Sequence, residues 1–172
     1  MRTSRLLAAV PVLLGLTVVA GCGPSVPEGY VETTQGQLRL VVPEGWVAGE
    51  TSGDVDLVRQ DAAGDDPAVR LAAMSDYPDT SARGAINQIL TFQVLGVPDS
   101  PGGLSEVDGD SDMWRYDATV DGGAAHVVAW ALCDSSKDAC VMVTISGKSA
   151  LDEKLLSTVQ DSIQIVDAAD EG

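Results

Sequence analysis

The chain has 172 residues, 45% of them hydrophobic, which is enough for one domain whose core needs neither a metal nor a dense set of disulfides. Its charge is lopsided, with 26 acidic residues against 10 basic ones, and the only charged residues that precede Cys22 are Arg2 and Arg5. From Cys22 onward the formal charge is therefore −18, from eight basic and 26 acidic residues. Such a charge repels phosphate backbones and anionic lipid headgroups, so it argues against a nucleic-acid partner and against electrostatic docking to a membrane.

The first 21 residues have the layout of a secretory signal peptide. A short basic region, residues 1–5, precedes an apolar core at residues 6–19. This core is shorter than the roughly 20 residues that a membrane-spanning helix needs, so we expect cleavage. An ordinary secretory signal and an uncleaved anchor are the alternatives to the lipoprotein signal described next.

The segment ends in VAGC at residues 19–22, which resembles the bacterial lipobox. The resemblance implies that the Cys22 thiol receives a diacylglyceryl group, that the chain is cut before it, and that the new amine can be acylated. Two or three acyl chains, at about 0.8 kcal/mol per buried methylene, hold a protein at a membrane. We therefore expect a cleaved signal peptide at residues 1–21, a lipidated tether at 22–29, and a protein on the extracytoplasmic face of the cell membrane.

Apolar runs separated by Gly- and Asp-bearing turns predict a single α+β domain in residues 30–166, built on an antiparallel sheet. The expected strands cover residues 37–42, 55–60, 69–76, 104–107, 113–120, 125–133 and 141–146. The last two are apolar on both sides, which is typical of central strands covered on both faces of a sheet. The polar residues 167–172 predict a loose tail.

Two helices are expected. Residues 82–95 carry an apolar stripe at a 3.6-residue period, with Ser81 as the N-cap and Gly96 at the end. The second helix is expected to begin at Ser149, which forms a capping pair with Asp152 three residues later. It should bury Leu151, Leu155, Val159 and Ile163.

The register of the hairpin between residues 113–120 and 125–133 depends on its loop. A three-residue loop, 121–123, sets Trp114 opposite Trp130 and keeps aromatic and aliphatic side chains on one face, whereas a two-residue loop sets Arg115 opposite Val128. We expect the three-residue loop.

The sequences VPEGY at residues 26–30 and VPEGW at 42–46 echo each other. Pro followed by Glu-Gly favours a tight turn, so we expect two similar turns rather than a duplicated unit. The order of the elements, together with GQLRLVVPEGW at residues 36–46, resembles the PsbP-like family and, within it, actinobacterial lipoproteins of the LpqN type. The resemblance covers residues 30–166. It implies an α/β/α sandwich, members that bind or assist larger assemblies, and no shared catalytic residues.

Cys133 and Cys140 bracket a six-residue loop. If their strands pair directly, the two cysteines face each other, and an oxidising compartment favours a disulfide between them. A redox-active pair is the alternative, but it usually needs the closer C-x-x-C spacing.

The stretch 108–112 offers carboxylates at alternate positions, from Asp108, Asp110 and Asp112, as the first half of a calcium loop does. Met113 and Thr119 stand where that loop needs Gly and Glu, so we expect a solvated turn, with weak divalent-cation binding as the alternative. No metal and no cofactor beyond the covalent lipid is expected.

His126 is the only histidine, which argues against a histidine-based zinc site and against a mechanism that needs two histidines. The sequence also lacks the G-x-S-x-G motif of a nucleophile elbow. We expect His126 to be packed and hydrogen-bonded, and the protein not to be an enzyme. The expected function is protein binding or assembly in the cell envelope, with a partner that has a basic face and contacts at Tyr30, Trp46 and Tyr77. The alternative is a carrier or sensor of a small apolar ligand held between sheet and helix, which a large apolar pocket would favour.

Overall fold

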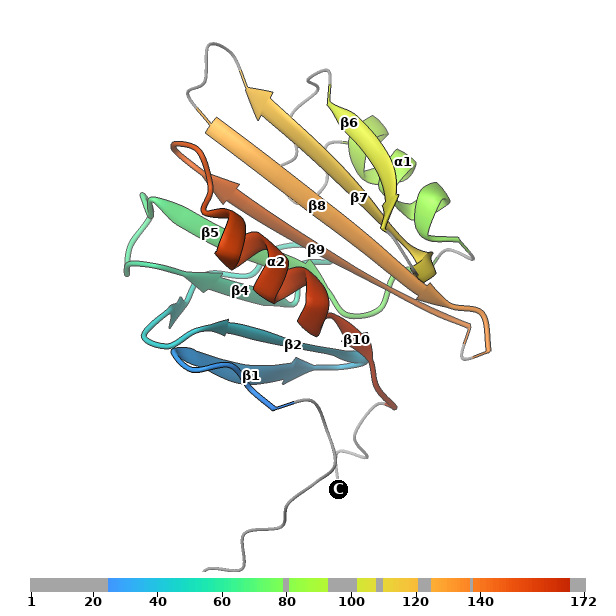
Figure 1. Cartoon of the computed structure of the whole chain (residues 1–172), viewed down its shortest axis with the longest axis horizontal. Coiled ribbons are helices and arrows are strands. Elements are labelled where there is room, and N and C mark those ends of the chain that lie inside the picture. Colours follow the sequence, from blue (N-terminus) through green and yellow to red (C-terminus); the bar gives the residue numbers. More distant parts are fainter. Residues whose placement is uncertain are drawn as a thin grey trace, which may run out of the picture.

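The computed structural model describes residues 25–78, 81–92, 102–107, 110–120, 125–136 and 138–167 (Figure 1). In chain order the elements are β1 (Tyr30–Gln35), β2 (Leu38–Pro43), β3 (Val47–Ala48), β4 (Leu57–Gln60), β5 (Val69–Met74), α1 (Ala82–Phe92), β6 (Gly103–Val107), β7 (Asp110–Val120), β8 (Ala125–Asp134), β9 (Ala139–Gly147), α2 (Glu153–Ser162) and β10 (Gln164–Ile165). Within this part of the chain, neither helix is long and apolar enough to span a membrane.

The strands form two antiparallel sheets. The larger has seven strands in the order β3-β4-β5-β9-β8-β7-β6, and the smaller has three in the order β1-β2-β10. β8 and β9 lie in the interior of the larger sheet and are buried on both faces, as their continuous apolar sequences predict. The predicted α+β class, single domain and antiparallel pairing are confirmed.

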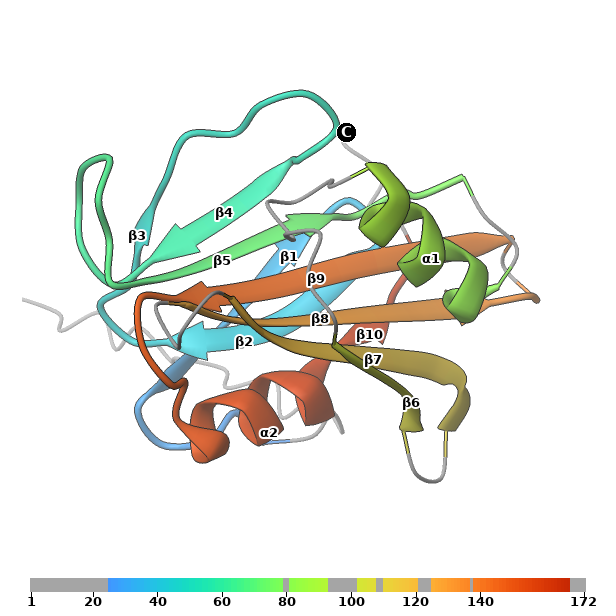
Figure 2. The same cartoon turned by 90° about the horizontal axis from the view of Figure 1, so that it is seen from above.

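The two helices lie on opposite faces of the larger sheet (Figure 2). Along β8, Ala129 and Ala131 belong to the core beneath α1, whereas Val128 and Trp130 belong to the core beneath α2. The smaller sheet covers the same face as α2, because Leu40 of β2 packs into the α2 core. One face of β8 and β9 is thus covered by α1, and the other is covered by α2 and the smaller sheet.

The start of α1 is as predicted. The Ser81 hydroxyl accepts a hydrogen bond from the Gly84 N–H at 3.2 Å, and the Ser81 carbonyl accepts one from the Ala85 N–H at 2.9 Å. Ser81 therefore caps the helix. The predicted last turn, residues 93–95, and Gly96 lie outside the described residues.

The predicted start of α2 at Ser149 is wrong, because the N-cap is Asp152. Its backbone is extended, with φ −70° and ψ 125°, and its carboxylate accepts a hydrogen bond from the Leu155 N–H at 2.9 Å. Leu156 is fully buried, and Leu155 is only half-buried. The predicted burial of Leu151, Val159 and Ile163 is confirmed.

The predicted register of the β7–β8 hairpin is also wrong. Val120 pairs with Ala125, so four residues connect the strands, Arg115 lies opposite Trp130, and Trp114 lies opposite Ala131. Both faces of β8 carry buried apolar side chains, so either register sets apolar residues of β8 opposite β7, and alternation along β8 does not select one. The loop residues 121–124 lie outside the described part.

Three strands that are short or polar, β1, β3 and β10, were not predicted from the sequence. β1 has polar residues at four of its six positions, and β3 and β10 have two residues each. β1 and β10 build the smaller sheet on either side of β2. The single predicted sheet is therefore two sheets.

Candidate functional site

The echoed sequences form two tight turns, residues 27–30 and 43–46, which we call the paired turns. The Tyr30 N–H donates to the Pro27 carbonyl and the Trp46 N–H donates to the Pro43 carbonyl, each at 3.2 Å. The third residue of each turn is a glycine with a positive φ, 81° at residue 29 and 89° at residue 45, a backbone that glycine adopts without strain. The prediction of two similar turns is confirmed.

The paired turns lie side by side at the open end of the β1–β2 hairpin. Tyr30 pairs with Pro43 across the two strands, and the Glu44 N–H donates to the Gly29 carbonyl at 2.8 Å. The side chains of Tyr30 and Trp46 are both half-buried, and Trp46 packs in part against the α2 core. The two predicted contact residues are therefore brought to one end of the smaller sheet.

Exposed apolar side chains gather around the paired turns. Within the described residues, the exposed large hydrophobic side chains are Val26, Val31 and Val47, at 43%, 44% and 38% exposure. Each valine is the residue immediately before or after one of the turns. Glu28 and Glu44 are exposed within the turns themselves. Exposed apolar side chains interspersed with exposed carboxylates are typical of a surface that binds another protein.

Tyr77 does not belong to this surface. It is only 9% exposed, it lies in the α1 core, and its hydroxyl donates to Gln88 Oε1 at 2.9 Å. The Tyr77 N–H donates to the Cys140 carbonyl at 2.9 Å, which ties the residues after β5 to β9. This burial removes Tyr77 from the candidate contact residues.

A groove of about 240 Å³ lies beside the paired turns, between the N-terminal segment, β2 and α2. Its lining includes Val26, Glu32, Val41 and Asp161. Pockets for small molecules usually measure roughly 300–1,000 Å³ and enclose most of the ligand. Buried apolar side chains occupy the helix–sheet interfaces of the described residues, at which the carrier alternative would hold its ligand.

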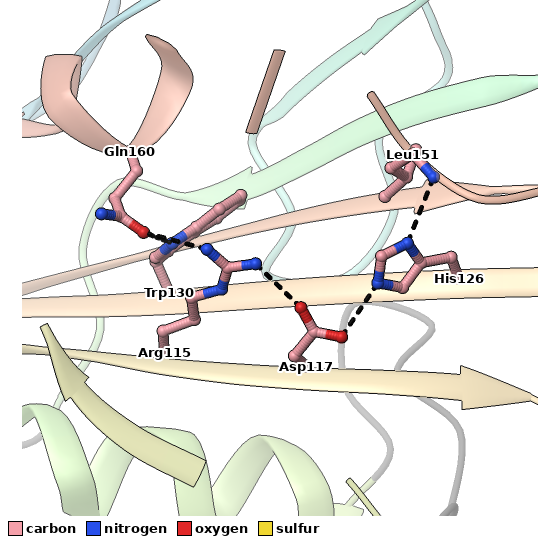
Figure 3. Close-up of polar contacts among 6 residues, drawn as sticks. All are labelled: Arg115, Asp117, His126, Trp130, Leu151 and Gln160. Atoms are coloured by element: carbon pink, nitrogen blue, oxygen red, sulfur yellow. Dashed lines mark hydrogen bonds and ion pairs between the residues drawn. The ribbon is translucent and has the colours of Figure 1, made fainter. Parts of the chain in front are cut away.

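A chain of polar contacts joins α2 to β7 and β8 (Figure 3). Gln160 Oε1 accepts hydrogen bonds from Trp130 Nε1 at 2.9 Å and from Arg115 Nη1 at 3.4 Å. The Arg115 guanidinium also lies 5.8 Å from the centre of the Trp130 ring and donates to Asp117 Oδ2 at 2.8 Å. These contacts give Arg115 partners on the face that α2 covers.

His126 uses both ring nitrogens in this chain of contacts (Figure 3). Nδ1 accepts a hydrogen bond from the Leu151 N–H at 3.2 Å, so the bonding pattern assigns the proton to Nε2, which lies 2.9 Å from Asp117 Oδ1. Burial raises the pKa of Asp117, but the hydrogen bonds from Arg115 and His126 and the positive charge of Arg115 outweigh it and hold that pKa below its ordinary value. His126 is thus a packed, hydrogen-bonded residue without a free nitrogen for proton transfer to a substrate.

Cys133 and Cys140 lie opposite each other on β8 and β9 with their Cα atoms 4.1 Å apart, and they form a disulfide. The Cys140 carbonyl accepts its hydrogen bond from Tyr77, on the side away from β8. The two cysteines are therefore a non-hydrogen-bonded pair, the arrangement in which side chains approach most closely.

The other predicted site residues remain predictions. Cys22 and Asp108 lie outside the described residues, as does the side chain of Asp110, whereas Asp112 is exposed on β7. No group of three or more His, Cys, Asp or Glu side chains that could hold a metal occurs in the described part of the chain.

No protein-family model matches the sequence, and no curated protein does. Among solved structures, the chain is similar to the Ran-binding protein Mog1p of Saccharomyces cerevisiae, with a TM-score of 0.54, 12% identity, and coverage of 83% of this chain and 97% of that one. It is also similar to a mutant form of Mog1, with a TM-score of 0.51, 12% identity, and coverage of 80% and 95%. At this identity the likeness shows a shared α+β fold, and the resemblance to PsbP-like proteins stays a prediction.

Proposed function

We propose that this protein is a bacterial lipoprotein, anchored through Cys22 on the extracytoplasmic face of the cell membrane, and that it works as a non-catalytic protein-binding module of the cell envelope. The observation that carries the proposal is the surface of the paired turns, where Tyr30, Trp46, three exposed valines and two exposed glutamates lie within the turns or directly beside them. Interfaces between proteins have this composition, an aromatic and aliphatic centre within a polar rim.

The position of this surface fits an anchored protein. Only residues 23–26 separate Cys22 from the first turn, a span of under about 20 Å even when fully extended. An anchored domain would thus hold the paired turns close to the bilayer. The acidic surplus of the chain favours a partner with a basic face, in binding that weakens as salt is added.

Three further observations support the proposal. The helices on opposite faces of the larger sheet agree with the α/β/α arrangement that the PsbP-like resemblance implies. Mog1p, which shares the fold, is described as a Ran-binding protein, so the fold serves protein binding elsewhere, an argument by analogy alone. His126 is engaged at both nitrogens, which removes the residue best suited to acid–base catalysis near neutral pH.

The anchor is tested by fractionating cells that produce the wild-type chain or Cys22→Ala. We expect the wild type in the membrane fraction with acyl mass on Cys22, and the variant to lose that mass. A processed wild-type chain without acyl mass at its N-terminus would contradict the lipoprotein assignment.

The binding surface is tested by proximity labelling in intact cells, followed by pull-down at low and high salt. Central apolar contacts of an interface often contribute 2 kcal/mol or more each, so the double variant Tyr30→Ala/Val47→Ser should reduce recovery of the labelled partner at least about tenfold. Asn87→Ala, at an exposed position on α1, is the matched control and should leave recovery unchanged. Equal recovery of the partner by the wild type, the double variant and the control would refute the proposal. Turnover of an ester, glycoside or peptide that a single carboxylate substitution abolishes would refute it too.

A further inference from the structure

Within the described residues, no strand pairs with the outer edge of β1, which lies next to the paired turns (Figure 1). We propose that this edge accepts an extended segment of the partner protein as a fourth strand of the smaller sheet, and that the segment alternates basic and apolar residues. The inference rests on the proposed protein-binding function and specifies how the partner is bound.

The pairing of β1 with β2 fixes which backbone groups face outward. The Glu44 N–H bonds to the Gly29 carbonyl, and hydrogen-bonded pairs recur at every second residue of an antiparallel ladder. The odd-numbered residues of β1 therefore bond to β2, and the N–H and C=O groups of Glu32 and Thr34 point away from it. The outward N–H of Tyr30 is already used by Pro27.

Other strand edges of the described chain are short or irregular. β3, at one edge of the larger sheet, has two residues, and so does β10 in the smaller sheet. β6, at the other edge of the larger sheet, has a register shift between Glu106 and Val107. β1 has six residues in unbroken register with β2 and contains no Lys, no Pro and no bulge, the features that usually protect an edge from added strands.

The side chains of β1 indicate the chemistry of the added strand. Exposed Glu32 lies on the same face of β1 as Tyr30 of the first turn. Val31, which is 44% exposed, lies on the opposite face of the strand. A neighbouring strand places its side chains beside these at a period of two, so Lys or Arg suits the position next to Glu32 and an apolar residue suits the position next to Val31.

A second copy of this chain is a poor occupant. Pairing two β1 strands would bring two copies of Glu32 and Glu28 together, and each copy carries a formal charge of −16 in the full sequence. Strand addition supplies affinity through main-chain hydrogen bonds and specificity through alternate side chains. Charge complementarity therefore selects a basic partner segment.

The test uses the whole chain in a neutral detergent and two fluorescent peptides of seven residues, Lys-Val-Lys-Thr-Lys-Val-Lys. The second peptide is methylated on the backbone nitrogen of every lysine, which keeps its charge but removes the N–H groups that would bond to β1. We expect the wild-type chain to bind the first peptide at least about tenfold more tightly than the second at low salt, since the methylated peptide cannot donate to the outward carbonyls of Glu32 and Thr34.

Two variants locate the site. Thr34→Pro removes an outward N–H without touching the bonds to β2, so the first peptide loses a hydrogen bond to β1 and should bind at least severalfold more weakly, whereas Thr34→Ala keeps the N–H and should retain wild-type affinity. Circular dichroism checks that both variants fold, and the comparison of peptides on the wild-type chain stands even if Thr34→Pro does not.

Equal binding of the two peptides would overturn strand addition while leaving protein binding at the paired turns intact. Absence of binding by either peptide at low salt would overturn it too, and the partner recovery described above reports on the proposed function independently. A wild-type chain that dimerises, and that Thr34→Pro makes monomeric, would assign the edge to a second copy and refute a basic partner segment.

Discussion

Asp117 forms an ion pair with Arg115 of β7 at 2.8 Å and accepts a hydrogen bond from His126 Nε2 of β8 at 2.9 Å. Its side chain is 39% exposed, so solvent screens these contacts and their contribution to stability is modest. Arg115 and His126 are themselves tied to α2 and to the residues before it, through Gln160 and Leu151. A single carboxylate thus orients two side chains that hold α2 on the sheet.

We predict that Asp117→Asn lowers the free energy of unfolding at pH 7. The folded-state pKa of Asp117 lies below its ordinary value, so the carboxylate stabilises the fold above that ordinary value, and the contribution is lost as the pH falls through the folded-state pKa. The difference between wild type and variant should shrink below about pH 4. Urea denaturation between pH 3 and pH 7 measures it, with exposed Asp76→Asn as the control; a difference independent of pH would contradict the assignment.

At the scale of elements, α2 depends on the cap that the structure places at Asp152. Replacing an N-cap residue by alanine typically costs about 1 kcal/mol, so Asp152→Ala should destabilise the fold by that amount. Asp152→Ser should restore most of the loss, and Ser149→Ala should change the free energy of unfolding by under about 0.5 kcal/mol. Equal effects of Ser149→Ala and Asp152→Ala in urea denaturation would argue for the earlier helix start.

The β8–β9 hairpin is closed by the disulfide between Cys133 and Cys140, which are seven residues apart in sequence. A loop this short removes little entropy from the unfolded chain, so replacing both cysteines by alanine should cost under about 3 kcal/mol. Peptide mass mapping with alkylation before and after reduction checks the bond itself. Two thiols that alkylate freely in protein recovered from the cell envelope would exclude it.

At the scale of the whole molecule, the dominant property is the negative charge, a formal −16 for the full sequence. Carboxylates that repel one another destabilise the compact state, and added salt screens that repulsion. The same screening weakens attraction to a basic partner. Stability and partner binding should therefore respond to salt in opposite directions.

We predict that raising sodium chloride from about 20 mM to about 200 mM increases the melting temperature by a few degrees, because the screening length falls from roughly 20 Å to roughly 7 Å. Potassium chloride at equal ionic strength is the control and should give the same increase. A melting temperature that stays constant or falls would show that the acidic residues do not repel one another appreciably in the folded state.

Local patterns in the sequence were sufficient for part of the fold. Continuous apolar runs predicted the central strands β8 and β9, the stripe after Ser81 predicted α1, and the two Pro-Glu-Gly turns were predicted from their residues alone. Each depends on neighbours within a few positions in the chain, so the sequence by itself determines it. The predicted lipid anchor at Cys22 has the same local origin.

Tertiary structure decided the features that depend on distant segments. The polar residues of β1 become a strand because β2 pairs with them, and Tyr77 is buried because its backbone bonds to Cys140 and its ring packs beneath α1. The placement of α1 and α2 on opposite faces, and the register that separates Trp114 from Trp130, follow from the covering of both faces of the larger sheet. Where both faces of a strand are buried, its sequence does not alternate between apolar and polar residues. The sequence then cannot predict the strand register or which helix covers which face, and only the packing of the other elements determines them.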